Sequence, residues 1–437
     1  MTKTEFKKRR TQLLKSLNPN SIAILTTATE KFRNRDANYF FRPDSDFYYL
    51  TGFKEPEAIA LFLPQKNGGK FILFCREKDL LLETWNGRRA GVEGAKSEYQ
   101  ANEAYPISQI DEVLPELLEN KTDIYYTLGV NEAFDQRVLS GLNKTKEKTR
   151  MGIVAPDRFI SLDPIIHEMR LRKSSAEIAC MRKAAQISAK AHIKAMQACR
   201  PGIKEYAVEA ELIHGFKQAG CQSAYNTIVG GGANGCILHY VENNETLNDG
   251  ELLLIDAGAE YAYYAADITR TLPINGKFTP EQKAIYTLVL KAQLAAIRCV
   301  KPGNRWNQPH DAAVRVLTKG LVELGLLKGD VKQLIKNEKY RLFYMHKTGH
   351  WLGMDVHDVG EYKVNGKWRR LEPGMVLTVE PGLYIPQNTK GIAKKWRNIG
   401  VRIEDDVLVT KEGHEVLSSD VPKTIAEIES LMAKALQ

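Results

Sequence analysis

The strongest constraint on the fold is an internal repeat centred on a Pro-Gly pair. Pro201-Gly202 separates two long helical stretches, and Pro302-Gly303 separates another two in the same way. Sequence typical of β-strands follows each pair of helices, at residues 252–257 and 265–272 in the first copy and at 374–385 and 400–410 in the second. The repeat predicts two α-plus-β halves that share a central sheet, with a site between them that draws ligands from both.

The first part of the chain has a different pattern. Residues 21–163 alternate short apolar runs with amphipathic stretches such as 107–118, which is typical of a mixed α/β domain. Further on, Ser174 and Glu177 form a capping-box signature ahead of a helix that we expect to end at Cys199. We therefore expect an α/β N-terminal domain at residues 1–171 and an α+β domain with an internal pseudo-two-fold repeat at residues 172–437.

Composition narrows the choice of partners. No apolar run approaches the roughly 20 residues that a membrane helix needs, and the basic N-terminus has no apolar segment behind it. The formal net charge of +9 is scattered and accompanies no nucleic-acid motif. The six cysteines form no C-x-x-C pair, so we expect reduced thiols. These features favour a cytoplasmic protein that binds neither membrane nor nucleic acid.

In the first copy, two aspartates lie in or next to apolar segments that are typical of β-strands. Asp256 directly follows residues 252–255, and Asp267 comes eleven residues later. An acid at the end of an apolar strand is costly unless a cation pairs with it. Either aspartate alone is compatible with an N-cap or a turn, whereas the two at hairpin spacing predict carboxylates that converge on one cation.

A cluster of histidines occupies the second copy. His346, His350 and His357 are three of the nine histidines of the chain and stand within twelve residues. A lone histidine most often makes a structural hydrogen bond, whereas three in one glycine-punctuated segment favour a site.

Two glutamates also follow strand-like sequence in the second copy. Glu380 comes directly after residues 375–379, and Glu404 ends the stretch 400–404. Alternation along a strand points Arg402 and Glu404 to one face, so a solvated face with Arg402 as partner is the alternative for Glu404. The apolar residues 407–409 that follow favour a covered strand instead.

Together the candidates are the carboxylates of Asp256, Asp267, Glu380 and Glu404 and the imidazole of His350. Four negative charges match two divalent cations. A pair of such ions bridged by water explains why so many acids stand at apolar strand ends, and it lowers the pKa of that water towards roughly 7. Oxygen-rich ligation favours manganese over zinc.

These segments resemble the Xaa-Pro aminopeptidases (aminopeptidase P), which are metallopeptidases with the pita-bread fold. The motifs that carry the resemblance are residues 254–258, 266–270, 350–358, 378–384 and 401–406. Residues 35–36, 44–53 and 85–89 are similar to the N-terminal domain of that family, so the resemblance covers nearly the whole chain. It implies an α/β N-terminal domain followed by a pita-bread catalytic domain.

The resemblance implies a role for each metal-site candidate. Two manganese ions are then held by Asp256, Asp267, His350, Glu380 and Glu404. Asp267 and Glu404 bridge both ions in this assignment, and Glu380 doubles as a proton shuttle.

Further residues match positions around the site. His239 and His357 match histidines that contact the substrate and stabilise a tetrahedral intermediate. His346 and Arg402 match other residues that line the site.

Three positions match substrate contacts of the family, namely Asp36, Trp85 and Tyr384. The alternatives for them are, in order, an acid in a turn, a packed indole and a strand aromatic.

The implied activity is release of the first residue from peptides with proline in second position, with water or hydroxide between the two metal ions as nucleophile. Two alternatives stay open: an Xaa-Pro dipeptidase (prolidase), which uses the same ligands, and a non-catalytic pita-bread binding protein. The resemblance further implies a homo-oligomer, either a dimer or a tetramer, that acts on peptides.

Overall fold

The computed structural model describes residues 1–66 and 68–435 and divides into two compact units, Met1–His167 and Glu168–Gln437. Each unit has its own hydrophobic core. The division falls within helix α7 (Asp163–Leu171), a few residues before the expected boundary at residues 171 and 172. Among the described residues, no helix is long and apolar enough to cross a membrane.

The first unit is built on a mixed sheet, as the alternating pattern predicted. Its elements are α1 (Lys3–Ser16), β1 (Ser21–Thr26), β2 (Phe32–Asn34), β3 (Ala37–Asn38), α2 (Ser45–Thr51), β4 (Ile59–Leu63), β5 (Lys70–Cys75), α3 (Leu80–Asn86), α4 (Gly91–Ser97), β6 (Glu103–Pro106), α5 (Ile110–Leu118), β7 (Asp123–Tyr125), α6 (Glu132–Glu147) and β8 (Arg158–Ile160). Six strands pair in the order β6-β5-β4-β1-β7-β8. Apolar residues of α5 and α6 share one core with β1, β4 and β5, so these two helices cover one face of the sheet.

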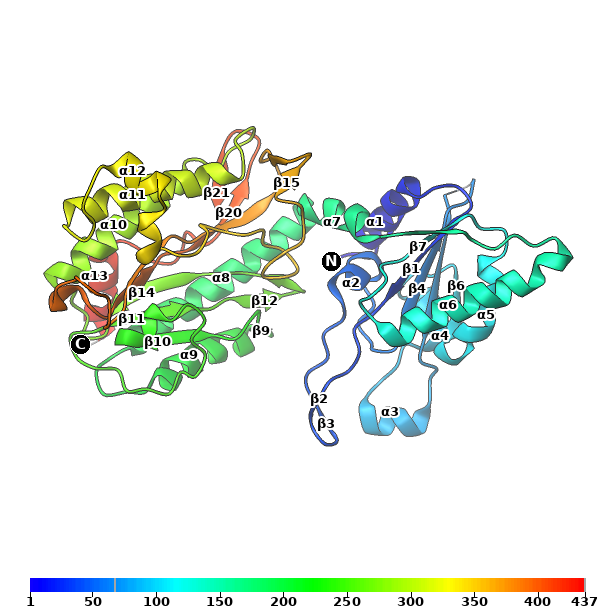
Figure 1. Ribbon diagram of the computed structural model, residues 1–437. Coiled ribbons are helices and arrows are strands. Elements are labelled where there is room, and N and C mark those ends of the chain that lie inside the picture. Colours follow the sequence, from blue (N-terminus) through cyan, green and yellow to red (C-terminus); the bar gives the residue numbers. More distant parts are fainter. Residues whose placement is uncertain (67, 436–437) are drawn as a thin grey trace. The chain divides into compact units, whose positions relative to one another are not determined.

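Two segments of this unit extend away from its sheet, the β2–β3 hairpin and helix α3 (Figure 1). Helix α3 has no buried residue. Its apolar side chains Leu80, Leu81 and Trp85 are 86%, 70% and 78% exposed. The core of the unit therefore does not use them.

The second unit contains the predicted duplication, but the described strands of its two halves pair in separate sheets and not in the shared central sheet that the repeat predicted. Its further elements are α8 (Ser175–Ala198), α9 (Glu205–Gln218), β9 (Gln222–Ser223), β10 (Ile228–Gly231), β11 (Leu252–Asp256), β12 (Ala259–Tyr261), β13 (Tyr264–Ala265), β14 (Thr269–Pro273), α10 (Pro280–Ile297), α11 (Asn307–Glu323), α12 (Val331–Lys336), β15 (Lys363–Val364), β16 (Lys367–Trp368), β17 (Val376–Val379), β18 (Gly382–Ile385), β19 (Ile399–Arg402), β20 (Asp405–Val409), β21 (His414–Val416) and α13 (Ile425–Ala435). The pair α8 and α9 precedes the antiparallel sheet β10-β11-β14, and the pair α10 and α11 precedes β17-β20-β21. Ser174 and Glu177 form the predicted capping box at the start of α8.

Each of the strand-like stretches 265–272, 374–385 and 400–410 contains a break. Strand β14 begins only at Thr269, β17 and β18 separate at residues 380–381, and β19 and β20 separate at residues 403–404. Pro381 has no N–H to continue a ladder. The carbonyl of Glu404 accepts a hydrogen bond from the Arg270 guanidinium instead of from a neighbouring strand. The chain changes partner at these breaks, because β17 pairs with β20 whereas β18 pairs with β19.

Candidate metal centre

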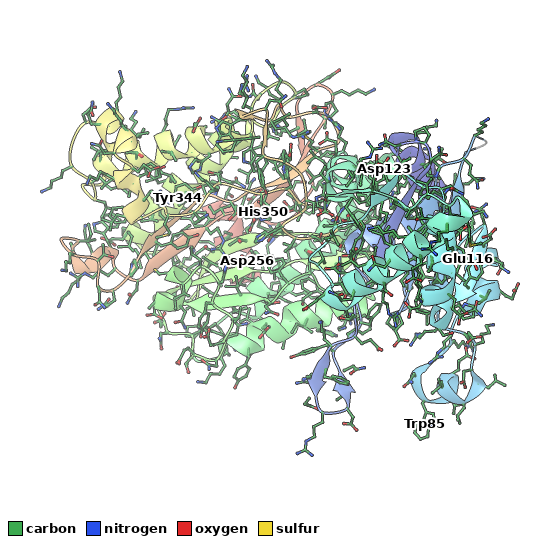
Figure 2. The ribbon with its side chains drawn as sticks, turned by 45° about the vertical axis from the view of Figure 1, so that its right-hand side comes forward. Trp85, Glu116, Asp123, Asp256, Tyr344 and His350 are labelled. Atoms are coloured by element: carbon green, nitrogen blue, oxygen red, sulfur yellow. The ribbon has the colours of Figure 1, made fainter. Side chains whose placement is uncertain are left out.

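The five candidate ligands line one cavity of about 650 Å³ in the second unit. The first half of the repeat supplies Asp256, at the end of β11, and Asp267, just before β14. The second half supplies His350 and the two glutamates at strand breaks, Glu380 and Glu404. Figure 2 labels Asp256 and His350, which line this cavity, near each other in the middle of the unit as drawn. The cavity therefore draws on both halves.

The candidate ligand atoms lie close together. One such atom each from Asp267, His350 and Glu404 lies within 4.8 Å of the other two. His350 Nε2 is 3.4 Å from Asp267 Oδ2 and 3.6 Å from Glu380 Oε1. Asp256 joins this group through Tyr225, whose hydroxyl oxygen lies 2.6 Å from Oδ1 of both aspartates. All five side chains form one contiguous group.

The group has an excess of buried negative charge. Asp256, Asp267 and Glu404 are 8%, 5% and 2% exposed. Burial raises the pKa of Glu404 well above its ordinary value, and the charges of Asp267 and Glu380 raise it further. Burial also raises the pKa of Glu380, to about 7. Because each of these carboxylates makes ionisation of the others less favourable, the group lacks a compensating positive charge. Four carboxylates and one imidazole suit divalent ions, and the many oxygens suit hard ions such as manganese, so these residues fit the implied metal pair.

A proton on His350 supplies part of the positive charge that the buried acids lack. Burial lowers the pKa of the imidazole, but the hydrogen bond to Asp267 and the charge of Glu380 outweigh burial and raise the pKa to about 9. Burial likewise opposes ionisation of Asp267, yet His350 keeps the pKa of that carboxyl below its ordinary value. The imidazolium supplies a positive charge among the acids, and a metal ion bound by His350 would release this proton.

Hydroxyl side chains that sequence reasoning missed support the carboxylates. Thr269 Oγ1 donates to Glu404 Oε2 at 2.6 Å, and Thr378 Oγ1 donates to Glu380 Oε1 at 3.3 Å. Both threonines belong to the motif segments, each two residues from a candidate acid, which is a weak signal. Tyr225 lies outside every motif and has no such signal.

Arg402 pairs with Asp256 and not with Glu404. This pairing contradicts the alternative in which Glu404 lies on a solvated strand face with Arg402 as its partner. Arg402 Nη2 donates to Asp256 Oδ2 at 2.6 Å, and Nη1 donates to the hydroxyl of Tyr384 at 3.1 Å. The Tyr384 hydroxyl also lies 2.8 Å from His346 Nε2. Tyr384 is a fully buried strand residue of β18, and its hydroxyl contacts two residues that line the cavity, Arg402 and His346. The 2% exposure of Glu404 contradicts a solvated strand face.

His239 and His357 are both exposed and both line the cavity. The His357 ring lies edge-on to that of His350, with 4.3 Å between ring centroids. Burial and the neighbouring charge of His350 lower the pKa of His357. His357 is therefore a neutral imidazole at the cavity wall near pH 7.

Asp36 and Trp85 belong to the first unit. Asp36 lies in the turn between β2 and β3 and is exposed, as the alternative of a turn acid describes. Trp85 projects from α3 (Figure 2), and its 78% exposure contradicts a packed indole within this unit.

Comparison with known proteins gives two family matches and closely similar sequences. Residues 179–411 match the metallopeptidase family M24, and residues 6–133 match the aminopeptidase P N-terminal domain. The chain is 49% identical over 433 residues to the Xaa-Pro aminopeptidase of Haemophilus influenzae, covering 99% of this chain and 98% of that one. It is 45% identical over 437 residues to the Xaa-Pro aminopeptidase of Escherichia coli, covering 100% of this chain and 99% of that one.

Solved structures agree with these matches. The aminopeptidase PepP of Pseudomonas aeruginosa superposes with a TM-score of 0.98 at 55% identity, over 100% of this chain and 99% of that one. Zinc-substituted aminopeptidase P of Escherichia coli in complex with product superposes with a TM-score of 0.97 at 45% identity, again over 100% and 99% of the two chains.

Proposed function

The chain belongs to metallopeptidase family M24, and from this membership we propose how its cavity performs Xaa-Pro aminopeptidase chemistry. The enzyme is a metal-dependent hydrolase that removes the N-terminal residue from peptides with proline in second position. The observation that carries the proposal is the meeting of four carboxylates and an imidazole from both halves of the repeat in one cavity.

We assign five residues to two divalent ions, Asp256, Asp267, His350, Glu380 and Glu404. Asp267, His350 and Glu404 would hold the ions at the centre of this group, because one ligand atom from each lies within 4.8 Å of the other two. Manganese is the proposed metal, since oxygen ligands predominate. The chemistry that bound ions supply here is a more acidic water and a polarised peptide carbonyl.

Glu380 moves the proton in this proposal. The carboxylate of Glu380 lines the same cavity as the other acids, where it can accept a proton from the attacking water and return it to the leaving nitrogen. Its Oε2 lies 3.6 Å from Nδ1 of His346, which Tyr384 holds from the other ring nitrogen. The Nδ1 of His346 meets the carbonyl oxygen of Lys347 at 2.7 Å, so the hydrogen bond that orients the Glu380 carboxylate is the one from Thr378 Oγ1 at 3.3 Å.

His239 and His357 donate hydrogen bonds to the oxygen that gains charge during attack on the peptide bond. Donors aimed at such an oxygen are among the largest contributors to catalysis. Both imidazoles line the cavity and are exposed to an incoming peptide. Arg402 acts on the other side by neutralising Asp256 at 2.6 Å.

The proline requirement has a physical basis in the substrate and in the cavity wall. A bond to proline is a tertiary amide without N–H, so an enzyme for it must recognise the ring instead. Ile228, Leu238 and Val356 supply apolar surface in the same cavity as the acids. Asp36 and Trp85 are proposed as further substrate contacts, because their exposed side chains serve no packing role in their own unit.

We also propose a cytoplasmic homo-oligomer, either a dimer or a tetramer. All six cysteines carry free thiols, which suits a reducing compartment. The exposed apolar side chains of α3, and those of Phe32 and Phe40 at 71% and 79% exposure, favour burial against a second copy.

A comparison of two peptides tests the function. The enzyme loaded with manganese should release arginine from Arg-Pro-Pro and act poorly on the dipeptide Arg-Pro.

One observation favours the prolidase alternative, because exposed Lys347 lines the cavity and offers a cation to a free carboxylate. Efficient cleavage of Arg-Pro with no cleavage of Arg-Pro-Pro would replace the aminopeptidase with a dipeptidase.

A further inference from the structure

One buried carboxylate holds the segment that carries His239 to helix α9. Glu205, the first residue of α9, is 0% exposed. Its side chain accepts four hydrogen bonds: Oε1 from Gly231 N at 2.8 Å and Asn234 Nδ2 at 3.0 Å, and Oε2 from Tyr240 OH at 2.7 Å and Glu245 N at 2.9 Å. All four donors lie within residues 231–245, on both sides of His239.

The position of His239 depends on this segment. In the part of the chain that the structure describes, no hydrogen bond holds the His239 imidazole, which is exposed in the cavity. The next residue, Tyr240, is 6% exposed and packs with Ile228, Leu254 and Tyr384. The hydrogen bond between Tyr240 and Glu205 therefore fixes the backbone from which the imidazole projects.

We propose that Glu205 is a positioning residue for His239 and sets where that imidazole meets the reacting carbonyl. This inference rests on the function proposed above. A misplacement of about 1 Å in a catalytic group can cost about a hundredfold in rate, so a residue that contacts no substrate can still control turnover.

An ionised carboxylate suits this position because all four neighbours are donors. A carboxylate only accepts hydrogen bonds, whereas the amide of glutamine has one accepting oxygen and one donating NH₂ group. In either orientation of a glutamine, its NH₂ group faces the two donors that now meet one oxygen of Glu205. Glu205→Gln therefore breaks at least one of these hydrogen bonds while keeping the size of the side chain.

A double-mutant cycle tests the proposal in the full-length, manganese-loaded enzyme. His239→Ala alone should lower kcat and kcat/KM together, with little change in KM. Glu205→Gln alone should lower kcat about tenfold with unchanged metal content. In the His239→Ala background, Glu205→Gln should lower kcat less than about twofold, because Glu205 affects kcat only by positioning the imidazole that this variant lacks. Glu209→Gln, one turn further along α9, is the matched control and should leave kcat unchanged.

Two further measurements guard against misfolding and against failure of the proposed function. Tyr240→Phe keeps the aromatic ring and removes only one donor, so it should lower kcat less than Glu205→Gln and also lose its effect in the His239→Ala background. Hydrogen–deuterium exchange should increase at residues 231–245 in Glu205→Gln but not in Glu209→Gln, whatever the peptide substrate.

Three results would overturn the inference. The first is an equal loss of kcat from Glu205→Gln with and without His239, and the second is unchanged kcat in a folded Glu205→Gln enzyme. The third is unchanged exchange at residues 231–245. If the wild-type enzyme cleaved no Xaa-Pro peptide, the proposed function would fail, and exchange would still decide whether Glu205 holds this segment.

Discussion

Lys173 Nζ lies 2.8 Å from Asp358 Oδ2, and each of these side chains is only 1% exposed. Arg170, at 3% exposure, approaches the other oxygen of Asp358 at 2.6 Å. One buried carboxylate thus serves two buried cations. Because Asp358 directly follows His357, this ion cluster also holds the end of the segment that begins at His350.

Asp358→Asn should destabilise the enzyme strongly. The substitution leaves the charge of Lys173 buried without its carboxylate and takes one of two carboxylates from Arg170, and loss of one member of a buried ion pair costs about 3–5 kcal/mol. Unfolding in urea measures this change. Asp355→Asn is the control, because Asp355 pairs with the same Arg170 but is 36% exposed. This substitution should lower the free energy of unfolding by less than about 1 kcal/mol. Equal losses from the two variants would contradict the reasoning.

Glu404→Gln should lose metal and turnover while keeping the fold. The substitution removes one negative charge from the cluster formed by Glu404, Asp267 and His350. Replacing even a residue that only supports a metal ligand lowers metal affinity or activity about 10- to 100-fold. Elemental analysis and kcat measure the two losses, and circular dichroism checks the fold. Glu372→Gln, at a partly exposed glutamate paired with Arg172, should behave as wild type. Wild-type turnover with two bound ions in Glu404→Gln would exclude the assignment.

Removal of metal by a chelator should abolish hydrolysis of Xaa-Pro peptides, and manganese should restore it best among divalent ions. The physical reason is the set of buried acids, whose charges need cations and whose oxygens favour hard ions. Activity assays after dialysis, with manganese, zinc, calcium or magnesium added singly, provide the measurement. Full activity in a thoroughly metal-free preparation would refute the requirement.

Acid should destabilise the enzyme through His192. This side chain is 0% exposed, its Nε2 lies 2.9 Å from the carbonyl oxygen of Ala257, and burial lowers its pKa to about 4. In the unfolded chain its pKa is about 6.5. The unfolded state therefore takes up this proton first, so His192 contributes its full stability above about pH 6.5. Between pH 6.5 and 4 that contribution falls by roughly 1.4 kcal/mol per pH unit.

The pH dependence of urea unfolding in wild type and in His192→Gln tests this expectation. Glutamine can still donate to the Ala257 carbonyl but does not titrate. The variant should lose less stability than wild type between pH 7 and pH 5. Identical pH slopes would show that His192 is not responsible.

The sequence predicted the fold and the candidate ligands because their signals are local. A capping box at Ser174 and Glu177, or an acid directly after an apolar run as at Asp256, can be recognised within a few residues. Asp256 and Glu380 followed an apolar run, His350 stood in a cluster of histidines, and the repeat indicated a site between two halves.

Other features escaped prediction because they depend on contacts between distant segments. Tyr225 meets both aspartates from a loop with no motif, and Arg402 pairs with Asp256 although Glu404 is nearer in sequence. The strand breaks escaped for the same reason. Whether a strand continues past Arg402 depends on which neighbours accept its hydrogen bonds, and alternation of apolar residues says nothing about that choice.

The division of the candidate ligands between the two halves of the repeat has a thermodynamic consequence. Asp256 and Asp267 come from one half and His350, Glu380 and Glu404 from the other, so a chain with only one half folded presents an incomplete set of donors. Ions that bind the complete set favour the native state over every partly folded one, by an amount that grows with the logarithm of ion concentration. Catalytic competence and cooperative folding of the duplicated unit thus draw on the same binding free energy.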